Sequence, residues 1–335
     1  MGGDAGPEVV VEGLGLFCKQ RADVDFILHG QPERIEPLLR QHKLSHRCTI
    51  IDHPDVVSMS AKPSSALRKA RGTSMWGMIE SVKQGDAVAG VSAGNTGALM
   101  AMSMLALRKM PGVHRPAMTA LWPTLEGRSV VLDVGANLDA DADQLVEFAV
   151  MGEAYARAVF GIERPTVGLL NIGAEDEKGP DAIKFAGEIM RTRDTGIDFY
   201  GYVEGNDISM GVVDVVVTDG FTGNVALKTA EGTARLVSRY VREALTSSLL
   251  SKAGAALASS GIRDLRTKLN PSSVNGGVLL GLNGVVVKSH GGADAEGYAT
   301  AVKLAADLAN SHYMEEVSAG LKRVSRLGIT PETVE

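Results

Sequence analysis

The chain has 335 residues, of which 44% are hydrophobic, and a formal net charge of −6 at pH 7. This length suits one large α/β domain or two lobes, and the acidic balance argues against a nucleic-acid partner. The two cysteines, Cys18 and Cys48, form no metal spacing and indicate a reducing compartment. The longest uncharged span, 88–107, approaches the ~20 residues of a membrane helix. Glycine and polar residues interrupt it, so we expect a cytoplasmic protein.

The first third of the chain alternates short strands with helices. Residues 1–7 predict a loop, followed by a helix over 8–21, a strand over 25–29, a helix over 32–42 and a strand over 48–52. A helix weakened around Gly72 is expected over 63–84. A strand over 86–91 then leads through a glycine-rich turn into a helix that Pro111 and Gly112 end.

The rest of the chain repeats this pattern. Strands are predicted over 129–134, 166–171, 199–203 and 213–218, the last followed by a long helix. A closing hairpin over 276–281 and 285–288 precedes one long amphipathic helix over 296–324. Short strands alternating with helices predict a largely parallel sheet covered on both faces. Ligands bind such sheets beyond the carboxyl ends of the strands.

Glycine and polar residues gather at those strand ends. In the loop 92–97, Gly94 and Gly97 permit a tight turn, while Ser92, Asn95 and Thr96 supply hydroxyl and amide groups. The helix that follows adds the positive end of its dipole, so the loop is suited to an anion. One such loop could equally be an ordinary capped turn, and the functional interpretation depends on its recurrence.

Common catalytic templates are absent from the sequence. There is no P-loop motif and no nucleophile elbow, and Gly13-Leu14-Gly15 lacks a third glycine because Cys18 occupies that position. The histidines are scattered, which argues against a zinc site. Lys178 is a lone ammonium in an acidic loop, where it either pairs with a neighbouring glutamate or stabilises developing negative charge.

Five loops in series resemble the bacterial phosphate acyltransferases, the acyl-[acyl-carrier-protein]:phosphate acyltransferases. They are Gly2-Gly3-Asp4, residues 92–98, residues 132–137, residues 169–173 with Lys178-Gly179, and residues 219–225. The resemblance runs in order from residue 1 to about residue 310. It implies the reversible transfer of a fatty acyl group from acyl carrier protein to inorganic phosphate. The product would be acyl phosphate for phospholipid synthesis.

The resemblance also implies a fold and partners. The fold would be a three-layer α/β/α sandwich, similar to isocitrate and isopropylmalate dehydrogenases, with a single catalytic domain over 1–335. The protein would be a homodimer. We expect no cofactor and assign no metal ligands, and the sequence leaves open whether a metal ion assists the reaction. It would associate peripherally with the inner face of the cell membrane, beside the downstream glycerol-3-phosphate acyltransferase.

The implied chemistry agrees with the residues. Phosphate supplies its own nucleophilic oxygen, and a thiol with a pKa of about 8.5 leaves readily. The protein must therefore position phosphate and stabilise an oxyanion. By resemblance, Lys178 is the main charge stabiliser, Asn224 is the amide that holds phosphate or oxyanion, and His290 is a partner for the thiolate. The other residues implied to bind substrate are Gly3, Asp4, Ser92, Gly94, Asn95, Thr96, Asp133, Asn137, Asn171, Gly173, Asp219, Thr222, Gly223 and Lys228.

Two surface segments carry separate expectations. The small, apolar residues 245–262, followed by Arg263, Arg266 and Lys268, suit either a packed helix pair, a subunit interface or a shallow membrane contact. The resemblance implies a protruding tip over 240–270 whose membrane residues are Leu249, Leu250, Ala255, Ala256 and Leu257. The basic run Lys62, Arg68, Lys69 and Arg71 is either a solvated face or the docking site for the acidic carrier protein.

The beginning of the chain departs from the family pattern. Family members place a short strand before the turn that Met1, Gly2 and Gly3 form here. We therefore expect a longer natural product, and a 335-residue form that is less stable because its sheet has a gap.

Three alternatives remain open at this point. A phosphotransacylase acting on acyl-CoA would need a nucleotide pocket and no carrier protein. A decarboxylating dehydrogenase would bind a divalent metal through Asp133, Asp139, Asp141, Asp143 and Asp219, although capping of turns is the simpler role for the first and last of these. A non-catalytic membrane scaffold predicts that Lys178→Ala changes nothing measurable except location.

Overall fold

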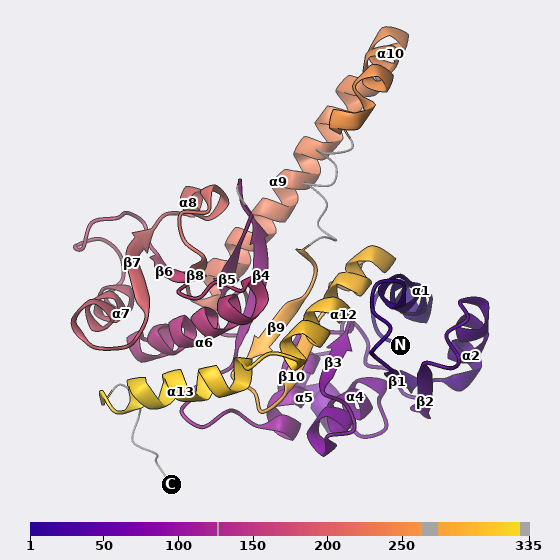
Figure 1. Ribbon diagram of the computed structural model, residues 1–335, viewed down its shortest axis with the longest axis horizontal. Coiled ribbons are helices and arrows are strands. Elements are labelled where there is room, and N and C mark those ends of the chain that lie inside the picture. The colour runs from indigo at the N-terminus through magenta and orange to yellow at the C-terminus, as the bar shows by residue number, and fades with distance from the viewer. Residues whose placement is uncertain (126, 263–273, 329–335) are drawn as a thin grey trace.

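The computed structural model describes residues 1–125, 127–262 and 274–328 (Figure 1). Within these ranges the strands are β1 (Phe26–Gly30), β2 (Cys48–Asp52), β3 (Ala89–Ser92), β4 (Ala117–Pro123), β5 (Arg128–Leu132), β6 (Thr166–Leu170), β7 (Asp198–Val203), β8 (Val215–Val217), β9 (Gly277–Leu280) and β10 (Val285–Lys288). Eight of them form one sheet in the order β3-β10-β9-β4-β5-β8-β6-β7, and β1 pairs with β2 in a second sheet.

The helices follow the strands as the sequence predicts. They are α1 (Gly6–Cys18), α2 (Pro32–Gln41), α3 (Pro63–Arg68), α4 (Ser74–Gln84), α5 (Thr96–Leu107), α6 (Ala142–Phe160), α7 (Asp181–Thr192), α8 (Gly205–Met210), α9 (Gly220–Thr246), α10 (Leu249–Leu257), α12 (Ala295–Ala309) and α13 (Tyr313–Ser325). Local signals set their ends. For example, Asp141 and Gln144 form a capping box at the start of α6, and Gly161 ends it with φ +68°.

The main sheet consists of two parallel halves that run in opposite directions. β3 pairs in parallel with β10, and β5, β8, β6 and β7 pair in parallel with one another. The antiparallel strands β9 and β4 join the halves. Lys288, which ends β10, pairs with Gly277, while Leu132, which ends β5, pairs with Thr119 beside β9. The strands of the two halves run in opposite directions, but their carboxyl ends lie at the same height in the sheet. We call this part of the sheet the junction.

Helices cover both faces of the sheet and give the predicted α/β/α layers. Val286 of β10 packs with Leu99 of α5, and Val131 of β5 packs beneath α9. Met118 of β4 packs against the residues around Leu99 and also against those around Val131, so α5 and α9 lie on the same face of the sheet. The other face carries α6, α12 and α13, which bury the neighbouring residues of the same strands.

Two sequence-based expectations are wrong at the level of elements. The strand β4 was not predicted, although it joins the two halves of the sheet. The single helix expected over 296–324 is two helices, α12 and α13, separated at residues 310–312. The break has a packing cause: Ala301 and Leu304 bury against β10 and its neighbours, whereas Tyr313 meets Tyr155 of α6 edge-on at 6.4 Å. One straight helix could not make both contacts.

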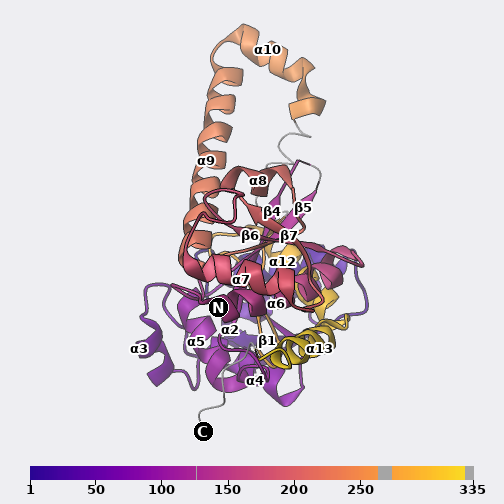
Figure 2. The same cartoon turned by 90° about the vertical axis from the view of Figure 1, so that its left-hand side faces the viewer.

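The long helix α9 leaves the body of the molecule after its first turns and carries α10 at its far end (Figures 1 and 2). The leucines of α10 are almost fully exposed, with Leu249 at 87%, Leu250 at 84% and Leu257 at 91%. Arg263, Arg266 and Lys268, the basic residues after the predicted tip, lie outside the described residues. Among the described helices, none combines the length and the apolar character that crossing a membrane requires.

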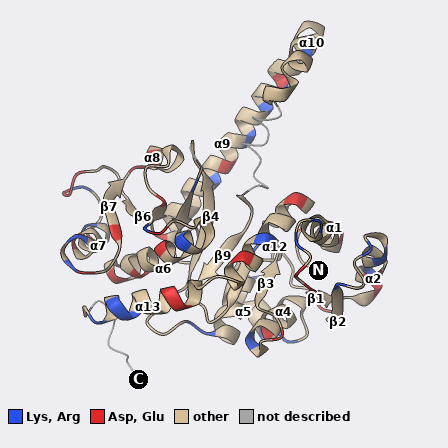
Figure 3. Ribbon diagram, in the orientation of Figure 1, with Lys and Arg blue, Asp and Glu red and all other residues tan. Residues whose placement is uncertain are grey.

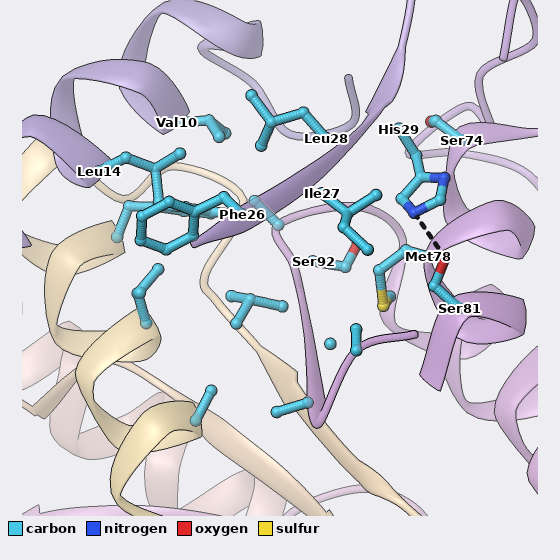
Figure 4. Close-up of a pocket in the computed structure, with 18 of the residues that line it drawn as sticks. Val10, Leu14, Phe26, Ile27, Leu28, His29, Ser74, Met78, Ser81 and Ser92 are labelled. Carbon is cyan, nitrogen blue, oxygen red and sulfur yellow. Dashed lines mark hydrogen bonds between the residues drawn. The ribbon is translucent and has the colours of Figure 1, made fainter. Parts of the chain in front are cut away.

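A cavity of about 420 Å³ separates β1 from β3 (Figure 4). It is lined by the consecutive residues 24–29 and 86–93, with Met1 and Gly2 among its other lining residues. Because alternate residues of a strand point to opposite faces, a void that touches consecutive residues lies along the strand edges. Within the described residues, β1 pairs only with β2, and β3 only with β10. The cavity is therefore bounded by one edge of β1 and one edge of β3, neither of which pairs with a strand on that side within the described residues.

The far wall of this cavity carries a buried histidine. His29 of β1 lies 3.2 Å from the hydroxyl of Ser81 of α4 (Figure 4). Burial, reinforced by the neighbouring His53, lowers the pKa of His29 to about 4. The imidazole is therefore neutral at pH 7, as expected for a residue that helps to line an apolar cavity.

Candidate active site

The predicted loops of both sheet halves converge on the junction. On their shared face of the sheet, α5 begins after Asn95 and α9 begins after Asp219, each capped by that residue's side chain. Because each helix follows the carboxyl end of a strand, and these ends meet at the junction, both helix N-termini face it. The positive ends of two helix dipoles therefore lie at the same level of the sheet, and each favours an anion close to it.

The first group of loops is held together by backbone contacts. Asp4 N–H donates to the carbonyl of Gly291 at 2.9 Å, and Ser289 N–H donates to the carbonyl of Ser92 at 2.9 Å. A Cβ at Gly2 would lie 2.9 Å from the Cα of Gly94, so these two loops approach too closely for any other residue. The loop before α1, the loop after β3 and the loop after β10 thus form one unit.

The second group is organised around Asp133. Its buried carboxylate accepts hydrogen bonds from the N–H groups of Met118 at 2.9 Å and Asn137 at 2.7 Å, and from the Asn137 side chain at 2.9 Å. Burial raises the pKa of Asp133, against the lowering effect of these hydrogen bonds. A Cβ at Gly223 would collide with the Asp133 carbonyl oxygen. The start of α9 therefore packs directly on this loop.

Asp133 and Asp219 have structural roles. Asp219 accepts a hydrogen bond from Thr222 N–H at 2.8 Å and one from the Thr222 hydroxyl at 2.7 Å. The capping role anticipated for both aspartates is confirmed. Across residues 1–125, 127–262 and 274–328, no group of three or more His, Cys, Asp or Glu side chains is placed to hold a metal ion.

Lys178 lies in the loop after β6. Its ammonium donates to the Glu175 carboxylate at 2.8 Å, and the Asn171 side chain donates to the Lys178 carbonyl at 3.0 Å. The hydrogen bond to Glu175 raises the pKa of Lys178, so the side chain stays charged while about half of it, 49%, is exposed. Glu175 is thus the partner of Lys178 in this structure, and a role for this lysine in catalysis stays a prediction.

Asn224 lies in the first turn of α9, beside Gly135 of the Asp133 loop. Its side chain is exposed and makes no hydrogen bond to any residue that the structure describes. One turn further on, Lys228 donates to Glu231 at 3.0 Å. The structure thus keeps the Asn224 amide available at the mouth of the junction.

Several polar side chains predicted to line a phosphate pocket are engaged within their own loops. Asn95 donates to the carbonyls of Met59 at 2.7 Å and Ala61 at 3.0 Å. The Asn137 amide and the Thr222 hydroxyl are held by Asp133 and Asp219, respectively, as described above. These three residues shape the loops, and the groups they leave for a ligand are backbone N–H groups.

The remaining predicted residues are dispersed around the junction. His290 follows β10, and its Nδ1 accepts a hydrogen bond from Gly292 N–H at 3.1 Å. Gly3, with φ +102°, lies against Ala93. Gly173 stands close to the Lys178 ammonium, in the loop after β6. Among the described residues, the hydrogen bonds of the Lys178 ammonium and carbonyl stay within the loop after β6, and the nearest neighbours of Gly173 are Lys178 and Glu175 of the same loop.

One charged residue at the junction was not singled out from the sequence. Lys288 ends β10 and is only 8% exposed. Its ammonium donates to the carbonyl of the next residue, Ser289. Burial lowers the pKa of Lys288 to about 8, an effect that Asp4 opposes and Lys228 reinforces. The sequence signal was a lysine that ends an otherwise apolar strand and opens a glycine-rich turn.

The basic run lies beside the first group of loops. Lys62, Arg68, Lys69 and Arg71 are all exposed, in and around α3. Asn95 bonds to the backbone just before α3, and a Cβ at Gly97 would lie 2.8 Å from Pro63. The cationic surface of α3 therefore adjoins the N-terminus of α5.

Comparison with known proteins identifies the family. Residues 1–316 match the family described as "Fatty acid synthesis protein". A phosphate acyltransferase from Maricaulis maris is 56% identical over 327 residues, covering 96% of this chain and 93% of that protein. A phosphate acyltransferase from Caulobacter vibrioides is 51% identical over 326 residues, covering 97% and 91%, respectively.

Solved structures share the fold at low sequence identity. A phosphotransacetylase from Streptococcus pyogenes superposes with a TM-score of 0.60 at 20% identity, covering 91% of this chain and 92% of that one. The EutD phosphotransacetylase from Staphylococcus aureus gives 0.54 at 14% identity, covering 90% and 99%. At these identities the likeness concerns architecture alone. The family match and the near full-length relatives together show that the chain belongs to the fatty acid synthesis protein family, as a phosphate acyltransferase, an enzyme that transfers acyl groups to phosphate.

Proposed function

We propose that the acyl donor is a fatty acyl thioester of acyl carrier protein and that the acyl phosphate product serves phospholipid synthesis. The observation that carries the proposal is the basic surface of α3 beside the N-terminus of α5. An acidic carrier protein docked there would have its thioester next to the place where two helix dipoles favour phosphate. Membership of the phosphate acyltransferases leaves the dehydrogenase and the non-catalytic scaffold without support.

The proposed reaction needs no nucleophilic side chain. A phosphate oxygen attacks the thioester carbonyl carbon, forming the C–O bond, and the C–S bond then breaks as the thiolate leaves and takes up a proton. The protein contributes position and charge: the N-termini of α5 and α9 hold phosphate, and Lys178 with Asn224 stabilises the oxyanion of the tetrahedral intermediate. Reversal transfers the acyl group from phosphate back to the thiol.

The choice of donor is tested by measuring acyl phosphate formation with palmitoyl acyl carrier protein and with palmitoyl-CoA, each with inorganic phosphate. We expect a higher kcat/KM for the carrier-protein thioester, because only this donor contacts the α3 surface. An equal or higher value for palmitoyl-CoA would replace the proposal with the phosphotransacylase alternative.

Charge reversal on α3 is expected to weaken carrier-protein docking. The double variant Arg68→Glu/Lys69→Glu should raise the KM for palmitoyl acyl carrier protein by about tenfold, with a steep dependence on salt, because exposed charges of like sign then face the acidic partner. Its KM for phosphate should not change. The matched control Arg164→Glu/Arg326→Glu makes the same charge change at exposed cations of other elements, and an equal rise in that control would contradict the docking site.

We propose that α10 contacts the inner face of the cell membrane. Its three exposed leucines lie at the far end of α9, and Lys252 is the one charged residue within the helix (Figure 3). Burying a leucine side chain contributes about 1.5–3 kcal/mol, so a tip of this kind suits shallow insertion between lipid headgroups. Such a contact would release acyl phosphate beside the downstream glycerol-3-phosphate acyltransferase.

The tip is tested with vesicles. Leu249→Glu/Leu257→Glu should lower binding to anionic phospholipid vesicles by at least about tenfold, while acyl phosphate formation in solution persists. Ala234→Glu/Ser238→Glu, at exposed positions of α9 away from the face that carries Leu236, Val237 and Tyr240, is the control of equal charge. If the leucine variant instead changes the sedimentation coefficient and leaves vesicle binding intact, the tip is a subunit interface.

We propose that the chain forms a homodimer through α9. Leu236, Val237 and Tyr240 are 49%, 45% and 60% exposed, and their spacing places them together on one side of the helix. An apolar stripe on a projecting helix suits a second copy of the same chain, because a twofold axis would pair the stripe with itself. Sedimentation of the wild-type chain measures this directly.

A further inference from the structure

We propose that Lys288 is a phosphate-binding residue of the junction, whose ammonium group and the N-terminus of α5 together hold the substrate anion. The inference rests on the proposed use of the junction for phosphate. The sequence singled out Lys178 and Lys228 as candidate lysines. Lys288 lies closer to the sheet than either and is far more buried.

Lys288 lies on the face of the sheet that carries α5. Alternate residues of a strand point to the same side, so Lys288 shares its face with Val286. Val286 packs with Ala98 and Leu99 of α5, whereas Val287 belongs to the core on the opposite face. In the parallel pairing of β3 and β10, Lys288 stands opposite Ser92, the residue that opens the loop into α5.

The N-terminus of α5 offers donors to the same region. Asn95 satisfies the N–H of Ala98 at 2.9 Å, but the N–H groups of Thr96 and Gly97 have no hydrogen-bond partner among the residues that the structure describes. Ser289 N–H donates to the Ser92 carbonyl, which fixes β10 and this loop together. A buried ammonium and two free amides at one helix start form a site for an anion.

Across the described ranges, no carboxylate lies within 4.0 Å of the Lys288 ammonium. The titratable groups that act on it are Asp4, from the loop before α1, and Lys228, from α9, and His290 lies two residues along the chain. Lys228 is itself paired with Glu231 at 3.0 Å. A bound anion would give the Lys288 ammonium the partner of opposite charge that it lacks here, whereas a purely structural lysine at this depth would be costly.

The pH dependence of anion binding tests the role. The free ammonium loses its proton as the pH rises through about 8, and a bound dianion would favour the protonated form. Binding above that pH must therefore take up a proton and must weaken as the pH increases. Lys178, whose pKa Glu175 raises, stays charged over the same interval and does not contribute to the change.

The experiment is isothermal titration calorimetry of the full-length chain with inorganic phosphate and with sulfate at pH 7 and pH 9. Sulfate keeps its double charge throughout, so its pH dependence reports on the protein alone. For the wild type we expect the dissociation constant for sulfate to be about fivefold to tenfold higher at pH 9 than at pH 7. The rise for phosphate should be smaller, because its doubly charged fraction increases over the same interval. Lys288→Arg, which stays charged, should show a sulfate ratio near one. Lys288→Met should bind weakly at both values, also with a ratio near one.

Steady-state kinetics adds a second readout. Lys288→Met should raise the KM for phosphate by about tenfold or more, consistent with the loss of one charge-assisted hydrogen bond, while the KM for the acyl donor stays unchanged. Circular dichroism checks that this variant is folded. Retention of the wild-type pH ratio in Lys288→Met, or its absence in the wild type, overturns the inference and leaves the proposed function intact. A wild-type chain that binds neither anion at pH 7 overturns both.

Discussion

Replacing Lys178 with alanine is expected to lower the rate of acyl phosphate formation by a factor on the order of 10² or more. The ammonium is held charged by Glu175 in the loop after β6, and the proposed mechanism uses this charge to stabilise the oxyanion of the tetrahedral intermediate. Loss of the charge removes stabilisation that exists only in the transition state, so kcat should fall more than the KM for phosphate rises. Initial rates with palmitoyl acyl carrier protein measure both constants.

Two variants make this result specific. Lys184→Ala removes another lysine that pairs with an acidic neighbour, Asp181 at 2.8 Å, from the helix that follows the same loop, and it should leave kcat within about twofold. Glu175→Gln keeps the ammonium of Lys178 but removes the charge that it pairs with here, and it should retain most of the rate. An unchanged kcat in Lys178→Ala would keep the chain in its family and remove this lysine from the chemistry.

An extended chain carrying a short apolar strand directly before Met1 is expected to melt about 3–6 °C higher than the 335-residue form. The cavity between β1 and β3 is bordered by two strand edges that are unpaired within the described ranges, and Met1 lies beside Gly30, at the carboxyl end of β1. Residues added before Met1 would thus run parallel to both strands. Each buried apolar side chain contributes about 1.5–3 kcal/mol, and ordering costs about 1–2 kcal/mol per residue. When the new backbone hydrogen bonds are added to these two contributions, the free energy of unfolding rises by a few kcal/mol.

The terminal amine adds to this effect. Burial lowers the pKa of the Met1 amino group, because folding removes this charged group from water. An extension would replace the amino group with an uncharged peptide bond and so remove this cost. Differential scanning calorimetry of the two forms gives the shift in Tm. The matched control is an extension of the same length with aspartate at alternate positions, which cannot enter the cavity without burying charge. Equal melting temperatures for the apolar and the aspartate extensions would contradict the fit.

Local sequence signals determine the elements and their order, because each strand, glycine-rich loop and helix start is encoded in consecutive residues. Asp219 and the glycines after it predict the start of α9, and Gly72 predicts the break between α3 and α4. The arrangement of the two sheet halves could not be predicted this way. It depends on the pairing of β4 with β9, which is distant in the sequence, and β4 itself was missed although Pro116 precedes it and Gly127 follows it.

The same distinction applies to the site. The loops that bring polar residues to the junction were predicted, since glycine and amide residues recur after the strands. The side chains of Asn95, Asn137 and Thr222 form hydrogen bonds within the protein, for example to Met59 and Asp133. The sequence alone does not show these hydrogen bonds, because they depend on how the loops pack. Lys288 was missed for a related reason, because its burial results from the pairing of β10 with β3 and β9.

The projecting part of α9 implies a gradient of local stability along one continuous helix. Its first turns are anchored by Asp219 and by contact with the Asp133 loop, whereas the turns near α10 have exposed side chains on every side. Opening of a helical segment with few tertiary contacts requires little free energy, so amide hydrogens should exchange with solvent progressively faster from residue 225 toward residue 246. The lipid contact proposed for α10 would use this gradient, because the outer turns can bend or unwind while the inner turns stay anchored on the Asp133 loop.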